Sequence, residues 1–137
     1  LHGADLSDTE LFETSFETAR LFQTQLRGAR AMRATFTAAN LIAADCSEAV
    51  FVGAALPSVR FVGATLLNAD FYDADLSRAT FDRARLEGAL FAKSRLSGTD
   101  LAGAQGLTAE ALVGAVVDRA TKLPPALQAR LGPFREQ

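Results

Sequence analysis

The sequence lacks tryptophan and contains one cysteine, one methionine and one histidine among its 137 residues. A single cysteine excludes an internal disulfide and leaves the redox compartment open. The only histidine is His2, at the N-terminus, so no Ser/His/Asp or Cys/His arrangement can form from internal residues. Neither a cluster of histidine and cysteine ligands nor a G-x-x-x-x-G-K-[ST] phosphate loop is present. These absences predict that the protein is not an enzyme and has no catalytic residues, metal site, cofactor or small-molecule substrate.

Long apolar runs are also absent. No stretch of about 18 apolar residues occurs, which predicts that the chain does not insert into a membrane. No basic segment followed by an apolar one opens the chain, so no signal peptide is visible and a cytoplasmic location is favoured. The chain begins at Leu1 without a methionine, as expected of a fragment or a processed chain. The net charge of −2 opposes binding to nucleic-acid phosphates.

What the sequence does contain is a five-residue repeat. From Leu6 to Leu101 every fifth residue is Leu or Phe in 18 of 20 positions, with Ala31 and Cys46 as the exceptions. The residue two places earlier is small, and it is Ala in 14 of the 20 repeats. A helix turns by about 100° per residue, so this period would leave it no apolar face. A flat strand would send alternate repeats to opposite faces. The period therefore predicts a solenoid that turns once per repeat.

The repeat unit resembles that of a known family. The segments Ala4-Asp5-Leu6-Ser7-Asp8, Ala74-Asp75-Leu76-Ser77-Arg78 and Ala39-Asn40-Leu41 are similar to the A(D/N)LXX unit of the bacterial pentapeptide-repeat proteins. The resemblance covers residues 1–106. It implies an all-β solenoid, a right-handed quadrilateral β-helix with four repeats per coil and about five coils. Residues four repeats apart then stack, at about 4.8 Å from coil to coil.

The repeat ends near Gly106, and we expect a helical cap over residues 107–132, followed by a frayed tail over residues 133–137. A first helix is predicted from Thr108, as N-cap, to Asp118. A second short helical turn is predicted from Pro124 through about Leu131, closed by Gly132. This cap would cover the open end of the solenoid, although a helix that binds a partner is an alternative.

The stacking of residues four repeats apart also predicts interior columns of aromatic rings and exterior ion pairs. Offset stacks are expected for Phe51, Phe71 and Phe91, for Phe61 over Phe81, and for Phe16 over Phe36. Cys46 falls at an interior position and is expected to be a buried small hydrophobe. Opposite charges should pair on the surface as Glu10 with Arg30, Glu13 with Arg33, Asp73 with Lys93, and Asp75 with Arg95.

The position directly after each central residue should face solvent, yet at two opposite corners it is apolar. The first stripe consists of Phe12, Met32, Val52 and Tyr72, and the second stripe consists of Phe22, Ile42 and Val62. Exposed apolar patches usually mark contacts, so these residues are the candidate binding residues, and both stripes end by Asp82 and Ala92. The alternative is that they only favour the extended backbone and shield one another.

The sequence predicts a structural or protein-interaction module, in which a rigid rod binds itself or a protein partner through the stripes. The resemblance implies an alternative, a DNA mimic that binds a type II topoisomerase such as gyrase. Such mimicry needs a strongly acidic face. Residues 1–106 hold 13 acidic and 10 basic residues, and no column of stacked residues is acidic throughout.

Overall fold

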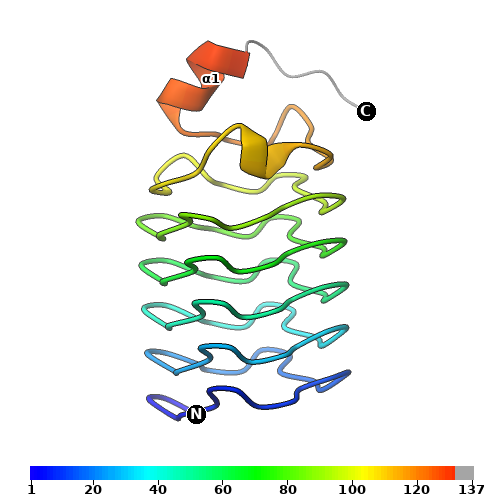
Figure 1. The fold of residues 1–137 in the computed structure, drawn as a ribbon, viewed down its shortest axis with the longest axis vertical. Helices are drawn as coiled ribbons and strands as arrows, with labels where there is room; N and C mark the ends of the chain where they lie inside the picture. Colours follow the sequence, from blue (N-terminus) through cyan, green and yellow to red (C-terminus); the bar gives the residue numbers. More distant parts are fainter. Residues whose placement is uncertain (132–137) are drawn as a thin grey trace.

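The computed structural model describes residues 1–131. Over this range the chain winds into a stack of coils, with the N-terminus at one end and its only α-helix, α1, Pro125–Leu131, at the other (Figure 1). The expected closure of that helix by Gly132 and the expected frayed tail over residues 133–137 lie outside the described residues.

The register of the coils is four repeats, as predicted. Parallel bridges join residues four repeats apart, from Asp5 with Gln25 to Arg85 with Gln105. In each bridge one residue makes two bonds to the coil before it: Gln25 donates its N–H to the Ala4 carbonyl over 2.8 Å and accepts from the Leu6 N–H over 2.7 Å. Four five-residue repeats therefore complete one turn.

The sides of the coil are too short to form strands. Each side contributes one bridge residue, and residues 1–131 contain isolated bridges instead of continuous strands. The reason is that two of the five residues in each repeat form a corner, which leaves too little extended backbone on each side. The expected β-helix thus has the predicted hydrogen-bond register but not the strands.

In the regular corners before Gly103, the turn is tight and its second central residue has a positive φ. At Asn68, for example, φ is 59°, and the Ala69 N–H donates to the Leu66 carbonyl over 3.2 Å, as in a type II turn. Many of these corner residues are not glycine, although the left-handed region costs an L-residue about 1–2 kcal/mol. Because the Asn68 N–H also donates to the Glu87 carbonyl of the next coil over 2.9 Å, a bond between coils offsets this cost.

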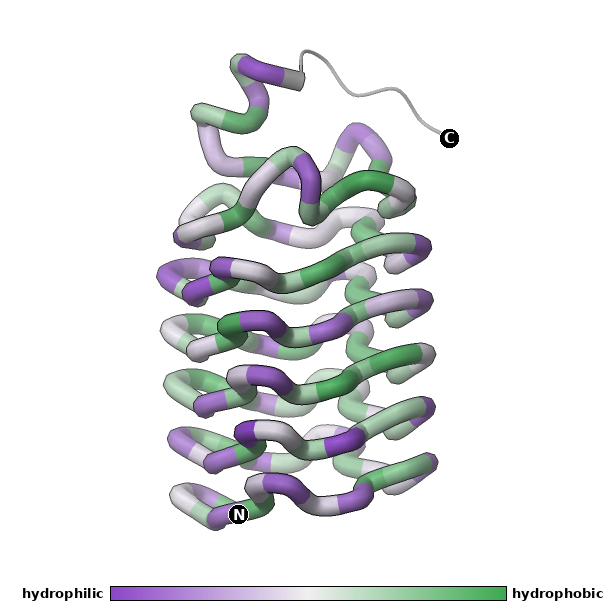
Figure 2. Tube along the Cα trace, viewed as in Figure 1, coloured by the Kyte–Doolittle hydropathy of each residue, from purple (hydrophilic) through white to green (hydrophobic). Residues whose placement is uncertain are grey.

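The core consists of the small and large apolar residues of each repeat. The predicted stacks are confirmed: the rings of Phe51 and Phe71 lie 5.2 Å apart at 6°, and those of Phe71 and Phe91 lie 5.1 Å apart at 10°. The pairs Phe61–Phe81 and Phe16–Phe36 are also stacked. Colouring by hydropathy shows hydrophobic and hydrophilic residues interleaved along every coil, as this alternation requires (Figure 2).

Cys46 is completely buried, as predicted. Burial raises the pKa of its thiol strongly, and the nearby Asp45 carboxylate acts in the same direction. The thiol is therefore protonated and inaccessible at neutral pH.

The prediction of a helix from Thr108 to Asp118 is wrong. The segment contains only the 3₁₀ turn η1, Glu110–Leu112. The N-cap of η1 is Ala109 and not Thr108, although the Thr108 hydroxyl oxygen accepts from the Ala111 N–H over 3.2 Å. The chain then continues as an irregular sixth coil because the N–H groups of the fifth coil need acceptors. Lys93, Leu96 and Leu101 donate to the carbonyls of Gly114, Val116 and Lys122 over 3.0, 2.8 and 2.7 Å.

The second predicted helical turn is confirmed by α1. Leu127 of α1 is buried, and so is Leu123, which directly precedes Pro124 and Pro125. Both residues belong to the buried apolar cluster of the core, and α1 lies beyond the last coil (Figure 1).

Replacing Phe71 tests the importance of the interior column. Phe71 is fully buried and stacks on rings above and below it, so Phe71→Ala should lower the free energy of unfolding by about 3–5 kcal/mol. The adjacent Tyr72 is 40% exposed, and Tyr72→Ala should cost about 1 kcal/mol or less. Urea denaturation of both variants measures the difference. Equal losses for the two would contradict the assigned inward and outward directions.

Candidate functional site

The first stripe follows one corner of the rod. Phe12 and Tyr72 are 52% and 40% exposed, and Met32 and Val52 between them are half-buried. All four occupy the first turn position of their corner, so the register of the coils stacks them in one column. The bridge of Val116 with Arg95 aligns Val113 with Ala92, so Val113, at 72% exposure, continues this column onto the sixth coil. The apolar surface on this corner therefore extends beyond Ala92, where the sequence predicted its end.

The second stripe lies on the opposite corner and is less exposed. Phe22, Ile42 and Val62 are half-buried. The His2 ring lies with its centroid 5.9 Å from that of Phe22, and its Nε2 is 3.1 Å from the Gln23 amide oxygen. The histidine therefore packs against the stripe at the first two coils.

Some of the surface charges are paired along the columns. Three of the predicted ion pairs are confirmed, with N···O distances of 3.3, 3.4 and 3.3 Å, for Arg30–Glu10, Arg33–Glu13 and Arg95–Asp75. In residues 1–131 the expected pair of Asp73 with Lys93 does not form. Instead the Lys93 Nζ lies 5.6 Å from the centroid of the Tyr72 ring, and the Arg33 guanidinium lies 5.8 Å from that of Phe12. A cation thus rests on each exposed ring of the first stripe.

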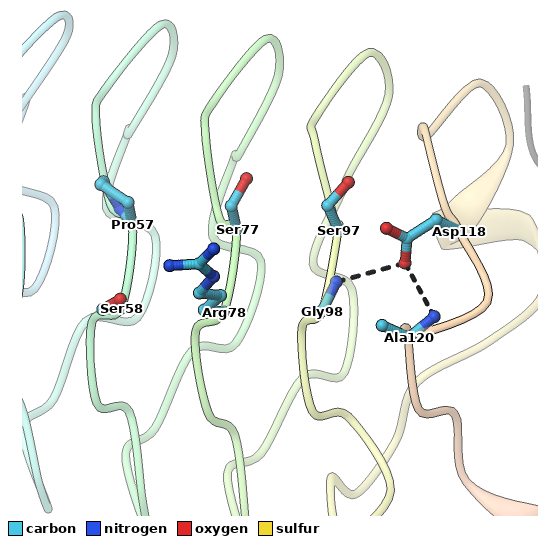
Figure 3. A pocket seen from close by; sticks show the side chains of 8 residues that line it. All are labelled: Pro57, Ser58, Ser77, Arg78, Ser97, Gly98, Asp118 and Ala120. Atoms are coloured by element: carbon cyan, nitrogen blue, oxygen red, sulfur yellow. Dashed lines mark hydrogen bonds between the residues drawn. The ribbon is translucent and has the colours of Figure 1, made fainter.

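A shallow groove of about 400 Å³ runs along a third corner, lined by Pro57, Ser58, Ser77, Arg78, Ser97, Gly98, Asp118 and Ala120 (Figure 3). In the lower coils the corner N–H groups bind a carbonyl of the next coil, as Arg78 does with Ser97 over 2.8 Å. At the last corner the Asp118 carboxylate takes this place and accepts from the N–H groups of Gly98 and Ala120 over 3.3 and 3.0 Å. Asp118 therefore ends the series of hydrogen bonds between successive coils at this corner.

The hydrogen bonds to Asp118 control its ionisation. Loss of hydration raises the pKa of the carboxyl, but bonds from the Gly98 N–H, the Ser97 hydroxyl, the Ala120 N–H and the Thr121 hydroxyl outweigh it and hold the pKa below its usual value. The carboxylate in the groove thus already accepts hydrogen bonds from groups of its own chain. The residues that line the groove include no histidine and no cysteine.

Within residues 1–131 no three His, Cys, Asp or Glu side chains are grouped so that they could hold a metal ion. The described helices include none that is long and apolar enough to cross a membrane.

Four exposed large apolar residues of the described range were not predicted from the sequence: Leu1, Leu90, Val113 and Val116. Leu90 is 55% exposed at a bridge position that is polar in most repeats, and that contrast was visible in the sequence. Val113 could not be placed in the first column, because the sequence pattern put it in a helix.

The four-repeat register and the columns of stacked side chains can be compared with known proteins. The family model for pentapeptide repeats matches residues 1–37, 34–71 and 69–105, with eight copies. The chain belongs to the pentapeptide-repeat family. Proteins of this family form right-handed quadrilateral β-helices, and the bridges between residues four repeats apart agree with that architecture. A comparison with curated protein sequences finds no match.

Several solved structures of pentapeptide-repeat proteins are similar to the chain. HetL from Nostoc sp. PCC 7120, described as involved in the regulation of heterocyst differentiation, is 26% identical, with coverage of 91% of this chain and 70% of HetL and a TM-score of 0.48. Rfr23 from Cyanothece 51142 is 20% identical, with 88% coverage of each chain and a TM-score of 0.44. The fluoroquinolone resistance protein QnrB1 is 20% identical, with coverage of 98% and 91% and a TM-score of 0.42.

Removing the Asp118 carboxylate tests its role at the end of that series of hydrogen bonds. Because its pKa is lower in the folded chain, its contribution to stability is present above the unfolded pKa of about 4 and is lost as the pH falls through the folded pKa. Asp118→Asn should therefore reduce the loss of stability on acidification. It should also speed amide hydrogen exchange at Gly98 and Ala120.

Asp8→Asn is the control, since it makes the same change at an exposed corner residue and asparagine tolerates its φ of 58°. Urea denaturation between pH 7 and pH 3, with exchange followed by NMR, measures both effects. An unchanged pH profile and unchanged exchange in Asp118→Asn would refute the assignment.

Proposed function

We propose that this pentapeptide-repeat protein is a non-catalytic interaction module, in which residues 1–106 form the rigid rod and residues 107–132 the cap. The rod binds itself or a protein partner through the first and second stripes. The observation that carries the proposal is the exposure of two aromatic rings, Phe12 and Tyr72, at 52% and 40% in one column. Large rings are unfavourable in water when the fold does not need them there, and such patches usually mark contacts.

The rigidity of the rod supports this role. Regular coils are bound to one another through backbone hydrogen bonds on all four sides and at the corners. Side chains on one corner therefore keep fixed heights and directions, which lowers the entropy cost of binding. The charge pattern favours this function over DNA mimicry, because basic residues interrupt the acidic ones in the stacked pairs of the described residues, as Arg33 does after Glu13.

Serine substitutions in each stripe test the proposal. The variant with Phe12→Ser, Met32→Ser and Tyr72→Ser removes the first stripe, and the variant with Phe22→Ser, Ile42→Ser and Val62→Ser removes the second. Light scattering gives the solution mass, and a tagged chain captures proteins from a bacterial extract. We expect the wild type to associate with itself or with a captured protein, and at least one variant to lose that association.

The control variant carries Pro57→Ser and Leu67→Ser, which lie at the same turn position on the other two corners and are also half-buried. It should behave like the wild type. The proposal fails if both stripe variants keep every association of the wild type, or if the wild type shows none.

A further inference from the structure

The second turn position on the corner of the first stripe forms a column with an ordered charge pattern. From the first coil to the fifth, this charged column consists of Glu13, Arg33, Gly53, Asp73 and Lys93. The signs run negative, positive, neutral, negative, positive. Read in the opposite direction the order is positive, negative, neutral, positive, negative, which is the complement at every position. A column with this property matches an inverted copy of itself.

We propose that a second copy of this chain is the partner of the first stripe, bound antiparallel about a two-fold axis that passes through the Val52–Gly53 corner. Each protomer then presents the same corner to the other, as a two-fold interface requires. Glu13 faces Lys93 of the second copy, and Arg33 faces Asp73 of the second copy. This inference rests on the proposed function, because it names the partner that one of the two stripes takes.

Other registers of the same two corners place like charges opposite each other. A shift by one coil in one direction brings Arg33 opposite Lys93 of the second copy. A shift in the other direction brings Glu13 opposite Asp73 of the second copy. A parallel arrangement about an axis along the rod places every residue at the same height as its own copy, so Arg33 would lie beside Arg33 of the second copy. Like charges at contact distance oppose association, so the charges select one antiparallel register.

The other corners lack this alternation. The corresponding positions of the opposite corner are uncharged from Gly3 to Gly63. The column that begins with Asp8 has Glu48 in its third coil, which would face its own copy in the same arrangement. The column that contains Arg78 has no second charge in its five regular coils. The complementary pattern is therefore a property of the corner that also carries the exposed rings.

The apolar side chains of the first stripe fit the same register by size. The exposed ring of Phe12 faces the small Ala92 of the second copy, and Met32 faces the exposed ring of Tyr72. Val52 lies next to the axis and faces its own copy. Large residues thus oppose small or flexible ones, and a thioether against an aromatic ring is a favourable contact.

The surface is hollowed where the two copies come closest. A hollow of about 440 Å³ lies beside Gly53, and the charged side chains of Asp73, Lys93, Asp75 and Arg95 line it. Gly53 has no side chain, so the backbones can approach at the axis. The space beside it is open to the side chains of the second copy, and its lining supplies charges of both signs.

The ion pairs within each chain are compatible with the interface. Arg33 already binds Glu13 over 3.4 Å, with both side chains more than half exposed. In the dimer these two residues would meet Asp73 and Lys93 of the second copy, so that four charges of alternating sign form a square at each end. Each charge then has an opposite charge across from it, and Asp73 and Lys93, which do not pair with each other within one chain, gain partners in the second copy. Such networks contribute more than isolated surface pairs.

The length of the contact sets its strength. Five coils span about 19 Å between Glu13 and Lys93 at the usual coil spacing, and a corner is narrow. The interface therefore falls below the standard size for stable complexes, and dissociation constants in the micromolar to millimolar range are expected. Salt should weaken it further by screening the exposed charges.

Charge reversal followed by mixing tests the pairing. Arg33→Asp brings a new carboxylate opposite the native Asp73 of the second copy, and Asp73→Arg brings a new guanidinium opposite the native Arg33. Each variant alone should therefore dimerise at least about tenfold more weakly than the wild type.

An equimolar mixture of the two variants should recover the dimer. At one end the introduced aspartate then faces the introduced arginine, and at the other end the native Asp73 faces the native Arg33. Sedimentation velocity at increasing protein concentration measures both variants and their mixture. A mixture no more associated than its components would overturn the proposal.

Glycine substitutions test the position of the axis without touching the stripe. Gly53→Asp puts two carboxylates face to face, whereas Gly63→Asp makes the same change at a corner of the second stripe. Both glycines have a φ of +66°, and a Cβ meets only the flexible Arg33 side chain at position 53 and nothing within 4 Å at position 63. Asp73 shows that aspartate accepts this backbone, with a φ of 59°. Gly53→Asp should abolish the dimer and Gly63→Asp should leave it intact; equal effects would refute the axis.

Failure of this inference can be told apart from failure of the proposed function. If the wild type is monomeric at high concentration and low salt, the dimer is excluded. The proposed function as an interaction module is still supported if a stripe variant no longer captures a protein that both the wild type and the Pro57→Ser, Leu67→Ser control capture. Both fail together only if neither self-association nor a stripe-dependent partner is found.

Discussion

The structure depends on one constraint, the hydrogen-bond register of four repeats between successive coils. A single residue on each side of a coil makes the bridge, as Gln25 does with Ala4 and Leu6. One bridge is weak, but four sides and four corners repeat it in every turn. The corner bond of a residue such as Asn68 also holds a backbone conformation that a non-glycine residue would otherwise avoid. Once the register is fixed, identical positions stack and the interior can be filled by columns of alanine and of leucine or phenylalanine.

The same register gives the outer surface its order. Residues at a corner are held about 4.8 Å apart along the rod, and their heights are set by the backbone. A charge sequence along the chain thus becomes a charge sequence along a line in space. This geometry turns Glu13, Arg33, Asp73 and Lys93, which lie one or two full coils apart in the sequence, into one ordered column. It also places Phe12 and Tyr72 beside that column, where Arg33 and Lys93 rest on their rings.

Much of this could be predicted from the sequence, because the repeat is strict where the core is regular. The spacing of Phe51, Phe71 and Phe91 identifies an interior column without any coordinates. The prediction failed after Gly106, where Leu112, Val113 and Val116 follow a helical pattern. There the N–H groups of Lys93, Leu96 and Leu101 donate to carbonyls of the following segment and keep the chain coiled. Side-chain contacts could not be predicted either. Whether the Lys93 ammonium contacts the Asp73 carboxylate or the Tyr72 ring depends on local geometry that the sequence does not show.

The most direct test of the account is to locate the two-fold axis by thiol cross-linking. Cys46 is buried, so a single introduced cysteine is the only accessible thiol. With a short bismaleimide, Val52→Cys should cross-link to its own copy, because Val52 lies at the axis. Phe12→Cys alone should not cross-link, but it should do so when mixed with Ala92→Cys, because position 12 faces position 92 of the second copy. Cross-linking of Phe12→Cys to itself, with none between positions 12 and 92, would contradict the antiparallel register.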